Sequence, residues 1–464
     1  MTRDAGRTDV GSSLALALGS AVLWGLAHLW VGRRLTGALL MGIELILALA
    51  ATTAMLTAGP ALLALAVQPV WLWAFALTAL LVAGVTVSVT IRSYLLVRPK
   101  EASPAAQYLS AAAIGLLCAL IVAPLVYTAR LAYVSQTVVT SVFAESVTPI
   151  PVDDPWKDME RINILLIGAD AAANRVGVRT DSMTVASVDT RTGDTVLFGL
   201  PRNLENVPMP PGPARDRFPY GFEGQPPYTP GMLNEVYQYA EDYPEMAPRL
   251  NKRQRGPALL KRTVGGILGL DVPYYAMVDM RGFTEIVDAM GGVRVRVKDP
   301  IVYGLRNEGR IEPGRRRLSG EEALWYGRSR TYSDDYVRMS RQKCLLNAVA
   351  KQADPVTVFK SFERLARAAV DAISTDIPRE LLPDLVELSE KVKHSRIRSL
   401  QFVPPLIYSG APDYNLIKRE VAATLAAPPP APRAALPAVP TGNRGKNAAG
   451  RAGTRAVVLD SACD

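Results

Sequence analysis

Four arginines surround two adjacent aspartates in one short stretch of this chain, YGRSRTYSDDYVRMSRQ, which covers residues 326–342. Its charged residues are Arg328, Arg330, Asp334, Asp335, Arg338 and Arg341. Guanidinium groups match phosphate oxygens in pairs, so this cluster could clamp phosphates. It could equally be a nucleic-acid patch or a solvated helix face. Which chemistry applies depends on the polar residues that the fold brings beside it and on the compartment in which it lies.

Three further polar segments flank predicted strands. They are Gly168-Ala169-Asp170, Arg179-Thr180-Asp181-Ser182 and Leu200-Pro201-Arg202-Asn203. Asp170 follows a strand, where ligands usually bind in α/β sheets. Asp181 could join it as an oxygen ligand for Mg²⁺, which proteins often hold through one or two carboxylates plus substrate phosphates. Each segment also has an ordinary interpretation, as a turn-capping Asp, a surface Arg–Asp pair or a proline turn.

Together these segments contain two separated acids and six arginines near the ends of predicted elements. The six are Arg179, Arg202, Arg328, Arg330, Arg338 and Arg341. Two phosphates and one metal ion would use this set of charges well. A network of surface salt bridges is the alternative, but it does not require arginines to recur at strand ends. The residue types therefore favour a phosphate clamp.

The elements that must position these residues alternate between strands and helices. Apolar runs predict strands at 162–167, 182–188, 195–200, 274–278 and 293–297. Helices are predicted at 232–239, 257–268 and 282–290. This alternation is typical of a layered α/β domain. The Pro- and Gly-rich residues 205–231 are expected to form a long surface loop.

Two helices are expected to bracket the arginine cluster. Ser319 and Glu322 form a capping box, which predicts a helix from there to about Gly327. A second helix is predicted over residues 338–352. Its first arginines, Arg338 and Arg341, are three residues apart and therefore lie on one helix face. We expect that face to be turned back toward the arginines of the connecting segment.

The N-terminal quarter contains four apolar runs, each near the roughly 20 residues that span a bilayer. The runs cover residues 12–31, 35–58, 69–91 and 108–129. A cleaved signal peptide would need only one such run, so four runs predict a multi-span membrane region. Glu44 lies inside the second run, where an acid is costly. We expect it to serve packing or hydrogen bonding rather than transport.

Cations in the turns between these runs predict the orientation. Arg33 and Arg34 follow the first run, and Arg92, Arg98 and Lys100 follow the third. Placing both positive turns in the cytoplasm leaves the N-terminus and everything after residue 130 outside. The predicted location is therefore the cell membrane, multi-pass, with an extracytoplasmic C-terminal domain.

The part of the chain beyond the membrane region is only weakly basic. Eight of the 52 cations and four of the 43 anions precede residue 131, which leaves 44 cations and 39 anions after it. That excess is thin for a nucleic-acid-binding protein. With His28 and His394 as the only histidines, a histidine-based metal or triad site is disfavoured. Cys344 and Cys463 could pair if they lie outside the cell.

Four regions follow from these patterns. We expect a multi-span transmembrane region at 1–130 and a juxtamembrane helix and linker at 131–160. An extracytoplasmic domain should occupy 161–420, and an Ala- and Pro-rich disordered tail should occupy 421–464.

Eight motifs run in a fixed order over about residues 160–352: GAD, RTDS, LPRN, MLNEVY, VDMRGF, DAMGGVRV, YGRSR and DDYVRMSRQ. Each is weak alone, but together and in this order they resemble the LytR–CpsA–Psr family. The stretch GLAHLWVGRRLTGALLMG also resembles a small membrane hairpin found ahead of such domains in actinobacteria.

This resemblance implies a three-layer α/β/α sandwich with a central mixed sheet, preceded by about four transmembrane helices, and an apolar pocket for a lipid tail. Family members are extracytoplasmic transferases that move a glycopolymer from a polyprenyl-pyrophosphate carrier to peptidoglycan, using Mg²⁺. Asp170 and Asp181 would hold that Mg²⁺. The pyrophosphate would be gripped by Arg179, Arg202, Arg328 and Arg330, with Arg338, Arg341 and Gln342 completing or supporting the wall.

The implied reaction begins when a peptidoglycan hydroxyl attacks the sugar-linked phosphorus, and Asp181 is the first candidate to take its proton. The implied catalytic set is Asp181, Arg179, Arg328 and Arg330. Asp335 would be a supporting residue and matches the family's acid better than Asp334. The chain departs from the family at Asn203, where an Asp usually follows the arginine, so metal affinity or orientation could differ.

Three other functions remain open at this point. A membrane-anchored transcriptional regulator would need the soluble part in the cytoplasm and a broad basic face. A protein that only binds a polyprenyl-pyrophosphate glycan would explain the membrane region but not the paired acids. A pyrophosphatase would use the same site with water in place of a glycan hydroxyl.

Overall fold

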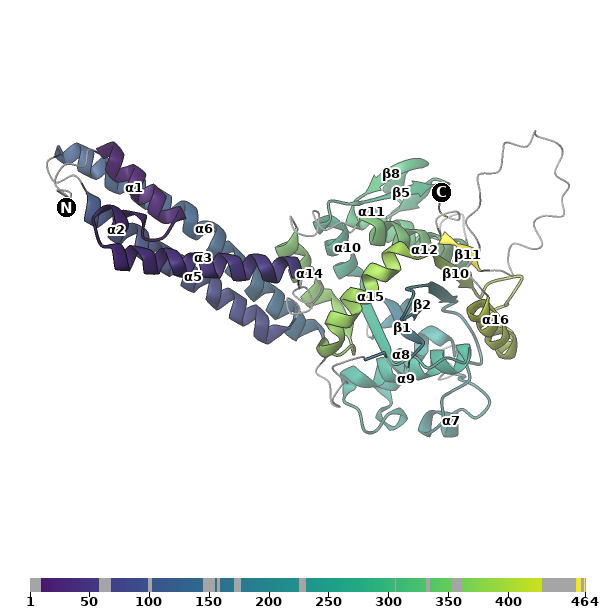
Figure 1. The fold of residues 1–464 in the computed structure, drawn as a ribbon. Helices are drawn as coiled ribbons and strands as arrows, with labels where there is room; N and C mark the ends of the chain where they lie inside the picture. The colour runs from purple at the N-terminus through teal and green to yellow at the C-terminus, as the bar shows by residue number, and fades with distance from the viewer. Residues whose placement is uncertain are drawn as a thin grey trace, which may run out of the picture. The chain divides into compact units, whose positions relative to one another are not determined.

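The structure of the protein is a computed structural model, and the chain forms two compact units, Met1–Thr140 and Ser141–Asp464 (Figure 1). The residues that the structure describes are 10–57, 68–98, 102–144, 155–156, 159–170, 177–224, 231–304, 306–330, 334–352, 361–427, 456–459 and 463. Each unit is described by itself below.

The N-terminal unit is helical. Its helices are α1 (Val10–Val22), α2 (Leu26–Trp30), α3 (Arg34–Thr57), α5 (Pro69–Val97) and α6 (Pro104–Val142). Three of them contain segments long and apolar enough to cross a membrane: Arg34–Ala54, Pro69–Val97 and Pro104–Val142. The predicted fourth run and the predicted juxtamembrane helix are one continuous helix, α6.

The first predicted run, residues 12–31, is interrupted in the structure. Gly25 adopts a φ of 92°, and a Cβ at that position would lie 2.6 Å from the carbonyl oxygen of Gly37. Glycine is the residue that tolerates both conditions. The run therefore forms α1 and α2, and α1 alone is shorter than a bilayer span.

Glu44 of α3 supports this break in the helix. Its Oε2 accepts a hydrogen bond from the backbone amide of Trp24, at 2.6 Å. An interrupted helix leaves amides without an intrahelical partner, and the carboxylate satisfies one of them. The hydrogen-bonding role predicted for Glu44 is therefore present.

The C-terminal unit is built on a mixed seven-stranded sheet with the order β11-β10-β3-β2-β1-β4-β9. The strands are β1 (Arg161–Asp170), β2 (Arg179–Asp189), β3 (Thr195–Leu200), β4 (Tyr274–Asp279), β9 (Ile373–Thr375), β10 (Ile397–Gln401) and β11 (Val457–Val458). The pairs β1–β4 and β10–β3 are parallel, and the other neighbours are antiparallel.

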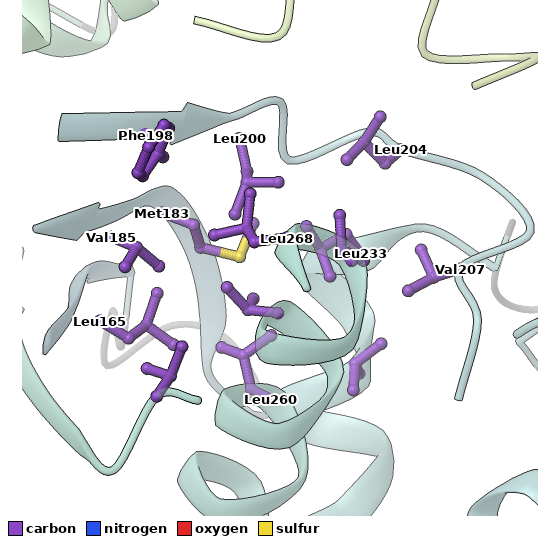
Figure 2. Packing of buried hydrophobic residues seen from close by; sticks show 14 of the residues in the cluster. Leu165, Met183, Val185, Phe198, Leu200, Leu204, Val207, Leu233, Leu260 and Leu268 are labelled. Carbon is purple, nitrogen blue, oxygen red and sulfur yellow. The ribbon is translucent and has the colours of Figure 1, made fainter. Parts of the chain in front are cut away.

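Helices cover both faces of this sheet, so the predicted three-layer sandwich is confirmed. Leu165, Met183 and Phe198 of the sheet share the larger core with side chains of α8 (Val236–Asp242), α9 (Lys252–Leu268) and α16 (Tyr414–Ala426). Figure 2 shows Leu260 and Leu268 of α9 packed beneath the strands. On the opposite face, Ile162 and Val188 pack against Leu388 of α15 (Leu382–His394).

A smaller core lies beside the sheet. It joins side chains of α10 (Met280–Ala289), α11 (Gly320–Arg328) and α12 (Asp335–Gln352) to two antiparallel ribbons. One ribbon pairs β5 (Val293–Val297) with β8 (Gly314–Leu318), and the other pairs β6 (Ile301–Tyr303) with β7 (Gly309–Ile311). The remaining elements are α7 (Pro213–Arg217), α14 (Phe362–Ala372) and the short 3-10 helices η1 (Leu233–Glu235), η2 (Pro244–Met246) and η3 (Arg379–Leu381).

The prediction of a surface loop over residues 205–231 was right for the largely irregular backbone and wrong for its exposure, and residues 225–230 lie outside the described residues. Val207, Met209 and Phe222 are at most 2% exposed and belong to the larger core. Phe218 and Phe222 stack edge-to-face, with ring centroids 5.1 Å apart. Proline and glycine obscured the apolar residues between them, which bury their side chains although most of the segment is irregular.

The prediction of a disordered tail from residue 421 was wrong at both of its described ends. α16 continues to Ala426, with Val421 1% exposed, and β11 adds an antiparallel edge strand beside β10. Apolar side chains at both places are buried, which offsets the entropy of ordering them. The middle of the predicted tail, residues 428–455, lies outside the described residues. Cys344 of α12 and Cys463, whose pairing was open, form a disulfide.

Candidate active site

A β-bulge at the end of β1 and β2 sets the position of the two candidate ligands. Gly168 pairs with Ser182 and Ala169 pairs with Thr180, so Asp181 is the extra residue of the bulge. Bulges re-aim side chains and are common beside functional sites. Asp170 ends β1 and is 2% exposed, and its Cα partner across the ladder is Arg179.

Arg202, just after β3, bridges two acids from different elements. Its Nη1 donates to Oδ1 of Asp181, and its Nε donates to Oδ2 of Asp335 at 3.2 Å. Burial by itself would lower the pKa of the Arg202 guanidinium, but the two carboxylates more than offset it and raise that pKa. Arg202 therefore stays charged between its two partners.

Asp335 forms ion pairs with three of the site arginines. Besides Arg202, it accepts hydrogen bonds from Nη1 of Arg330 at 3.4 Å and Nη2 of Arg338 at 3.1 Å. It is the first residue of α12, where a negative charge also suits the positive end of the helix dipole. Helix α12 thus begins three residues earlier than predicted, and Asp335 orients three guanidinium groups at once.

Arg338 is the most enclosed of these cations. Its side chain is 4% exposed, and within the described residues its Nε has no hydrogen-bond partner. Burial, and then the nearby positive charge of Arg202, lower the pKa of the Arg338 guanidinium. Even so, an arginine keeps its charge at neutral pH. A buried, incompletely satisfied guanidinium is an available partner for an anion.

Arg328 pairs with the other candidate metal ligand. Its Nη2 donates to Oδ2 of Asp170 at 2.8 Å, and its guanidinium lies 5.6 Å from the ring centroid of Trp325. Sequence reasoning missed Trp325, although the spacing of three residues on a capped helix would have placed both side chains on one face. The aromatic ring limits the orientations open to Arg328.

Two predicted residues hold the connecting segment rather than join the carboxylates. Nη1 of Arg341 donates to the carbonyl of Ser329 at 2.9 Å, and Nε2 of Gln342 donates to the carbonyl of Gly327 at 3.0 Å.

Arg179 is exposed at the end of the β1–β2 pair. Asn203, where the chain departs from the family pattern, donates from Nδ2 to Oγ of Ser409 at 3.0 Å.

The assembled site carries an excess of positive charge. The ten predicted site residues comprise six arginines, three aspartates and one glutamine, which gives a formal charge of +3. Ion pairs connect them into two groups, Arg328 with Asp170, and Asp335 and Asp181 with their arginines. A phosphate could replace a carboxylate as the partner of a guanidinium, and the displaced carboxylate would then need another cation as its partner.

The carboxylates suit Mg²⁺ only if a substrate completes its coordination. Within the described ranges, no group of three or more His, Cys, Asp or Glu side chains could hold a metal ion. Asp170 and Asp181 nevertheless match the one or two carboxylates by which proteins hold Mg²⁺ together with phosphates. Both carboxylates are paired with arginines, so phosphates that attract those guanidiniums would release oxygens for the metal.

Comparison with known proteins gives a family model that matches much of the chain and several relatives of low sequence identity. The model of the LytR_cpsA_psr family matches residues 133–424. The chain is 24% identical over 278 residues to Biofilm regulatory protein A of Streptococcus mutans, covering 57% of this chain and 62% of the relative. It is 24% identical over 238 residues to the polyisoprenyl-teichoic acid–peptidoglycan teichoic acid transferase TagU of Oceanobacillus iheyensis, covering 51% of this chain and 65% of the relative. The match therefore spans less than two thirds of the length of either relative.

Solved structures of similar proteins match the chain at low sequence identity and with low TM-scores. The crystal structure of TagV from B. subtilis has 22% identity and a TM-score of 0.42, covering 57% of this chain and 96% of that chain. The crystal structure of TagT from the same organism has 19% identity and a TM-score of 0.39, covering 61% and 98%.

Proposed function

The chain belongs to the LytR–CpsA–Psr family, and from this premise we propose that it is a phosphotransferase of cell-wall assembly. It would move a glycopolymer from a polyprenyl-pyrophosphate carrier to peptidoglycan on the outer side of the cell membrane. The relative TagU is named as a transferase of this class, which supports the choice of donor and acceptor.

One observation carries the proposal: ion pairs join carboxylates and arginines from five separate segments into two groups, and the ten site residues together have a formal charge of +3. Asp170 ends β1, Asp181 is the bulge of β2, Arg202 follows β3, Arg328 ends α11 and Asp335 begins α12. Salt bridges of this kind are weak evidence for stability, because desolvation offsets much of their attraction. An anionic substrate with two phosphates explains why so many guanidiniums converge here.

The reaction follows from these groups. A peptidoglycan hydroxyl forms a new bond to the sugar-linked phosphorus, and the bond from that phosphorus to the bridging oxygen breaks. The electron pair leaves with polyprenyl phosphate, and the hydroxyl proton passes to a carboxylate, for which Asp181 is our candidate. Arg328, Arg330 and Arg202 stabilise the negative charge that develops on the phosphoryl oxygens and the leaving group.

Asp170 and Asp181 would hold Mg²⁺ against the pyrophosphate, and the metal would add Lewis-acid stabilisation of the same oxygens. Arg179 lies beside Asp170 at the exposed end of the ladder, where it could meet the outer phosphate. Arg338 is enclosed and already shares Asp335, so its part is to complete the wall. Arg341 and Gln342 act indirectly, because they hydrogen-bond to the backbone that carries Arg328 and Arg330.

The assay uses the full-length chain in detergent, a synthetic polyprenyl-pyrophosphate disaccharide and a peptidoglycan fragment. We expect a phosphodiester-linked product and polyprenyl phosphate, both detected by mass spectrometry, and loss of both when EDTA removes Mg²⁺. Free sugar phosphate without linked product would instead identify a pyrophosphatase. No turnover of any kind would favour a protein that only binds the lipid-linked glycan.

Arg328→Ala should reduce transfer at least a hundredfold, since one preorganised charge partner of a transition state is typically worth 10²–10³ in rate. The matched control is Arg281→Ala on α10, an exposed arginine whose side chain is 88% accessible. Normal transfer by the Arg328 variant would contradict the clamp, whichever glycopolymer is the natural donor.

A further inference from the structure

Arginines crowd one face of the β5–β8 ribbon. Along β5 the buried Val293, Val295 and Val297 alternate with Arg294 and Arg296, which are exposed. Along β8 all three arginines of Gly314–Leu318 are exposed. None of these residues belongs to the carboxylate–arginine site described above.

The register brings like charges directly opposite each other. Arg294 pairs with Arg317 and Arg296 pairs with Arg315, so four guanidinium groups share the face away from the valines. Like charges directly opposite in a ribbon are destabilising. Arg317 also donates from Nε to the carbonyl of Gly291 at 2.6 Å. Burial of the valines builds the smaller core, whereas the opposed charges of the ribbon work against it.

Few acids compensate this face. In the part of the chain that the structure describes, Arg294, Arg315 and Arg317 form no ion pair with a carboxylate. Glu312, at the start of the β8 side, is already paired with Arg310 at 2.7 Å. The ribbon therefore presents its charge outward.

A hollow of about 390 Å³ lies at one end of the ribbon. Arg296, Val297 and Lys298 line it from the β5 side, and Pro313 and Gly314 line it from the β8 side. Two of the five lining residues are cations. This volume falls within the range of small-ligand sites, so one monomer of a polymer would fit.

The ribbon is held firmly to the rest of the unit. Gln352 of α12 accepts from the amide of Arg294 at 2.8 Å and donates to its carbonyl at 3.0 Å. Tyr326 of α11 and Leu345 of α12 pack in the core beneath the valines. The cations are consequently displayed on a fixed surface rather than on a loose hairpin.

From these observations we propose that the β5–β8 ribbon is a binding surface for a linear anionic polymer with phosphodiester charges. Alternate residues of a strand lie about 6.6–6.8 Å apart, so the two rows of arginines offer cations at a regular repeat. A guanidinium group pairs with a phosphate through two hydrogen bonds, whereas a neutral glycan offers it no charged partner. The inference does not depend on the transferase reaction, because it concerns binding at a different surface.

A bilayer surface is the less favoured occupant. Interfacial binding to lipids combines cations with apolar or aromatic side chains that enter the headgroup region. Among the described residues between 291 and 318, none is an exposed large hydrophobic side chain. The ribbon offers charge without such an anchor, which fits a water-soluble polymer.

The test measures binding of a fluorescein-labelled poly(glycerol phosphate) dodecamer to the full-length chain in phosphatidylcholine nanodiscs, by fluorescence anisotropy. Arg294→Gln combined with Arg315→Gln should weaken binding on the order of tenfold at 0.1 M salt, because two phosphate contacts are lost. The slope of log K against log salt should become shallower by about 1.4. Thermal stability should be equal or higher, because one like-charge neighbour of each remaining arginine is removed.

The matched control combines Arg249→Gln with Arg253→Gln, which removes the same charge at two exposed arginines, one shortly before α9 and one in its first turn. Unchanged polymer binding in the ribbon variant, or an equal loss in the control, would overturn the proposal. The proposal would also be overturned if phosphatidylglycerol vesicles displaced the probe at a phosphate concentration equal to or lower than the one at which unlabelled polymer displaces it. The binding and displacement results test the proposal whether or not the protein transfers a glycopolymer.

Discussion

Replacing Asp335 by Asn isolates the organising acid of the site. The side chain keeps its shape and an acceptor oxygen but loses the charge that three arginines share, at 3.2, 3.4 and 3.1 Å. Hydrogen bonds to charged groups contribute about 1.5–3 kcal/mol each in favourable geometry. These three are long, and Arg330 is largely exposed, so we expect a total loss of about 2–3 kcal/mol.

The same change should strengthen anion binding in the ground state. The formal charge of the ten site residues rises from +3 to +4 when the aspartate is neutralised. Inorganic pyrophosphate should therefore restore stability to the variant more than to the parent, since a ligand stabilises the state that binds it. Transfer should still fall, because the guanidiniums lose the acid that orients them.

The assay is thermal unfolding of the full-length chain in detergent, with and without pyrophosphate. A loss of 2–3 kcal/mol corresponds to a decrease of roughly 3–5 °C in Tm for a unit of the size of Ser141–Asp464. Asp334→Asn is the matched control, because Asp334 caps the amide of Val337 at 2.8 Å and Asn caps equally well. An unchanged Tm in the Asp335 variant, or an equal decrease in the control, would refute the account of Asp335 as the common partner.

Two further predictions concern stability and location. Burial by itself would raise the pKa of Asp189, but hydrogen bonds from Thr192 and Arg191 and the charge of Arg161 lower it below 3.8. A lowered folded-state pKa contributes stability above the unfolded pKa that is lost as the pH falls through the folded pKa, so Asp189→Asn should cost about 1 kcal/mol at pH 7 and progressively less as the pH falls into the acid range, measured by thermal unfolding. For the location, Arg281→Cys in intact cells should react with a membrane-impermeant maleimide, whereas reaction only after lysis would refute an extracytoplasmic domain.

Local patterns were enough to predict much of the α/β domain. The strands at 195–200 and 293–297 have the predicted bounds, because each is an apolar or alternating run with a clear stop. The helix capped by Ser319 begins where the capping box indicates, with the amide of Glu322 donating to the serine hydroxyl. Such signals need only neighbours in sequence.

Other elements depended on distant partners. The break at Gly25 needs the close approach of Gly37, and residues 205–231 are buried because the larger core receives their side chains. Strand β9 has three residues. Strand β11 has two, lies near the C-terminal end of the sequence and pairs with β10. Neither strand has a run long enough to show an apolar period.

For the site, the sequence by itself determined which residue types were available and roughly where each stood on its element. It could not determine which arginine meets which acid. Arg202 reaches Asp335 across 133 residues, and Arg328 reaches Asp170 across 158. Those pairings were decided only by the tertiary structure, because the β1–β2 bulge, the end of β3 and the start of α12 come together through sheet order and core packing. Salt largely screens exposed charges that are more than about 10 Å apart, so the fold must supply proximity before charge can select a partner.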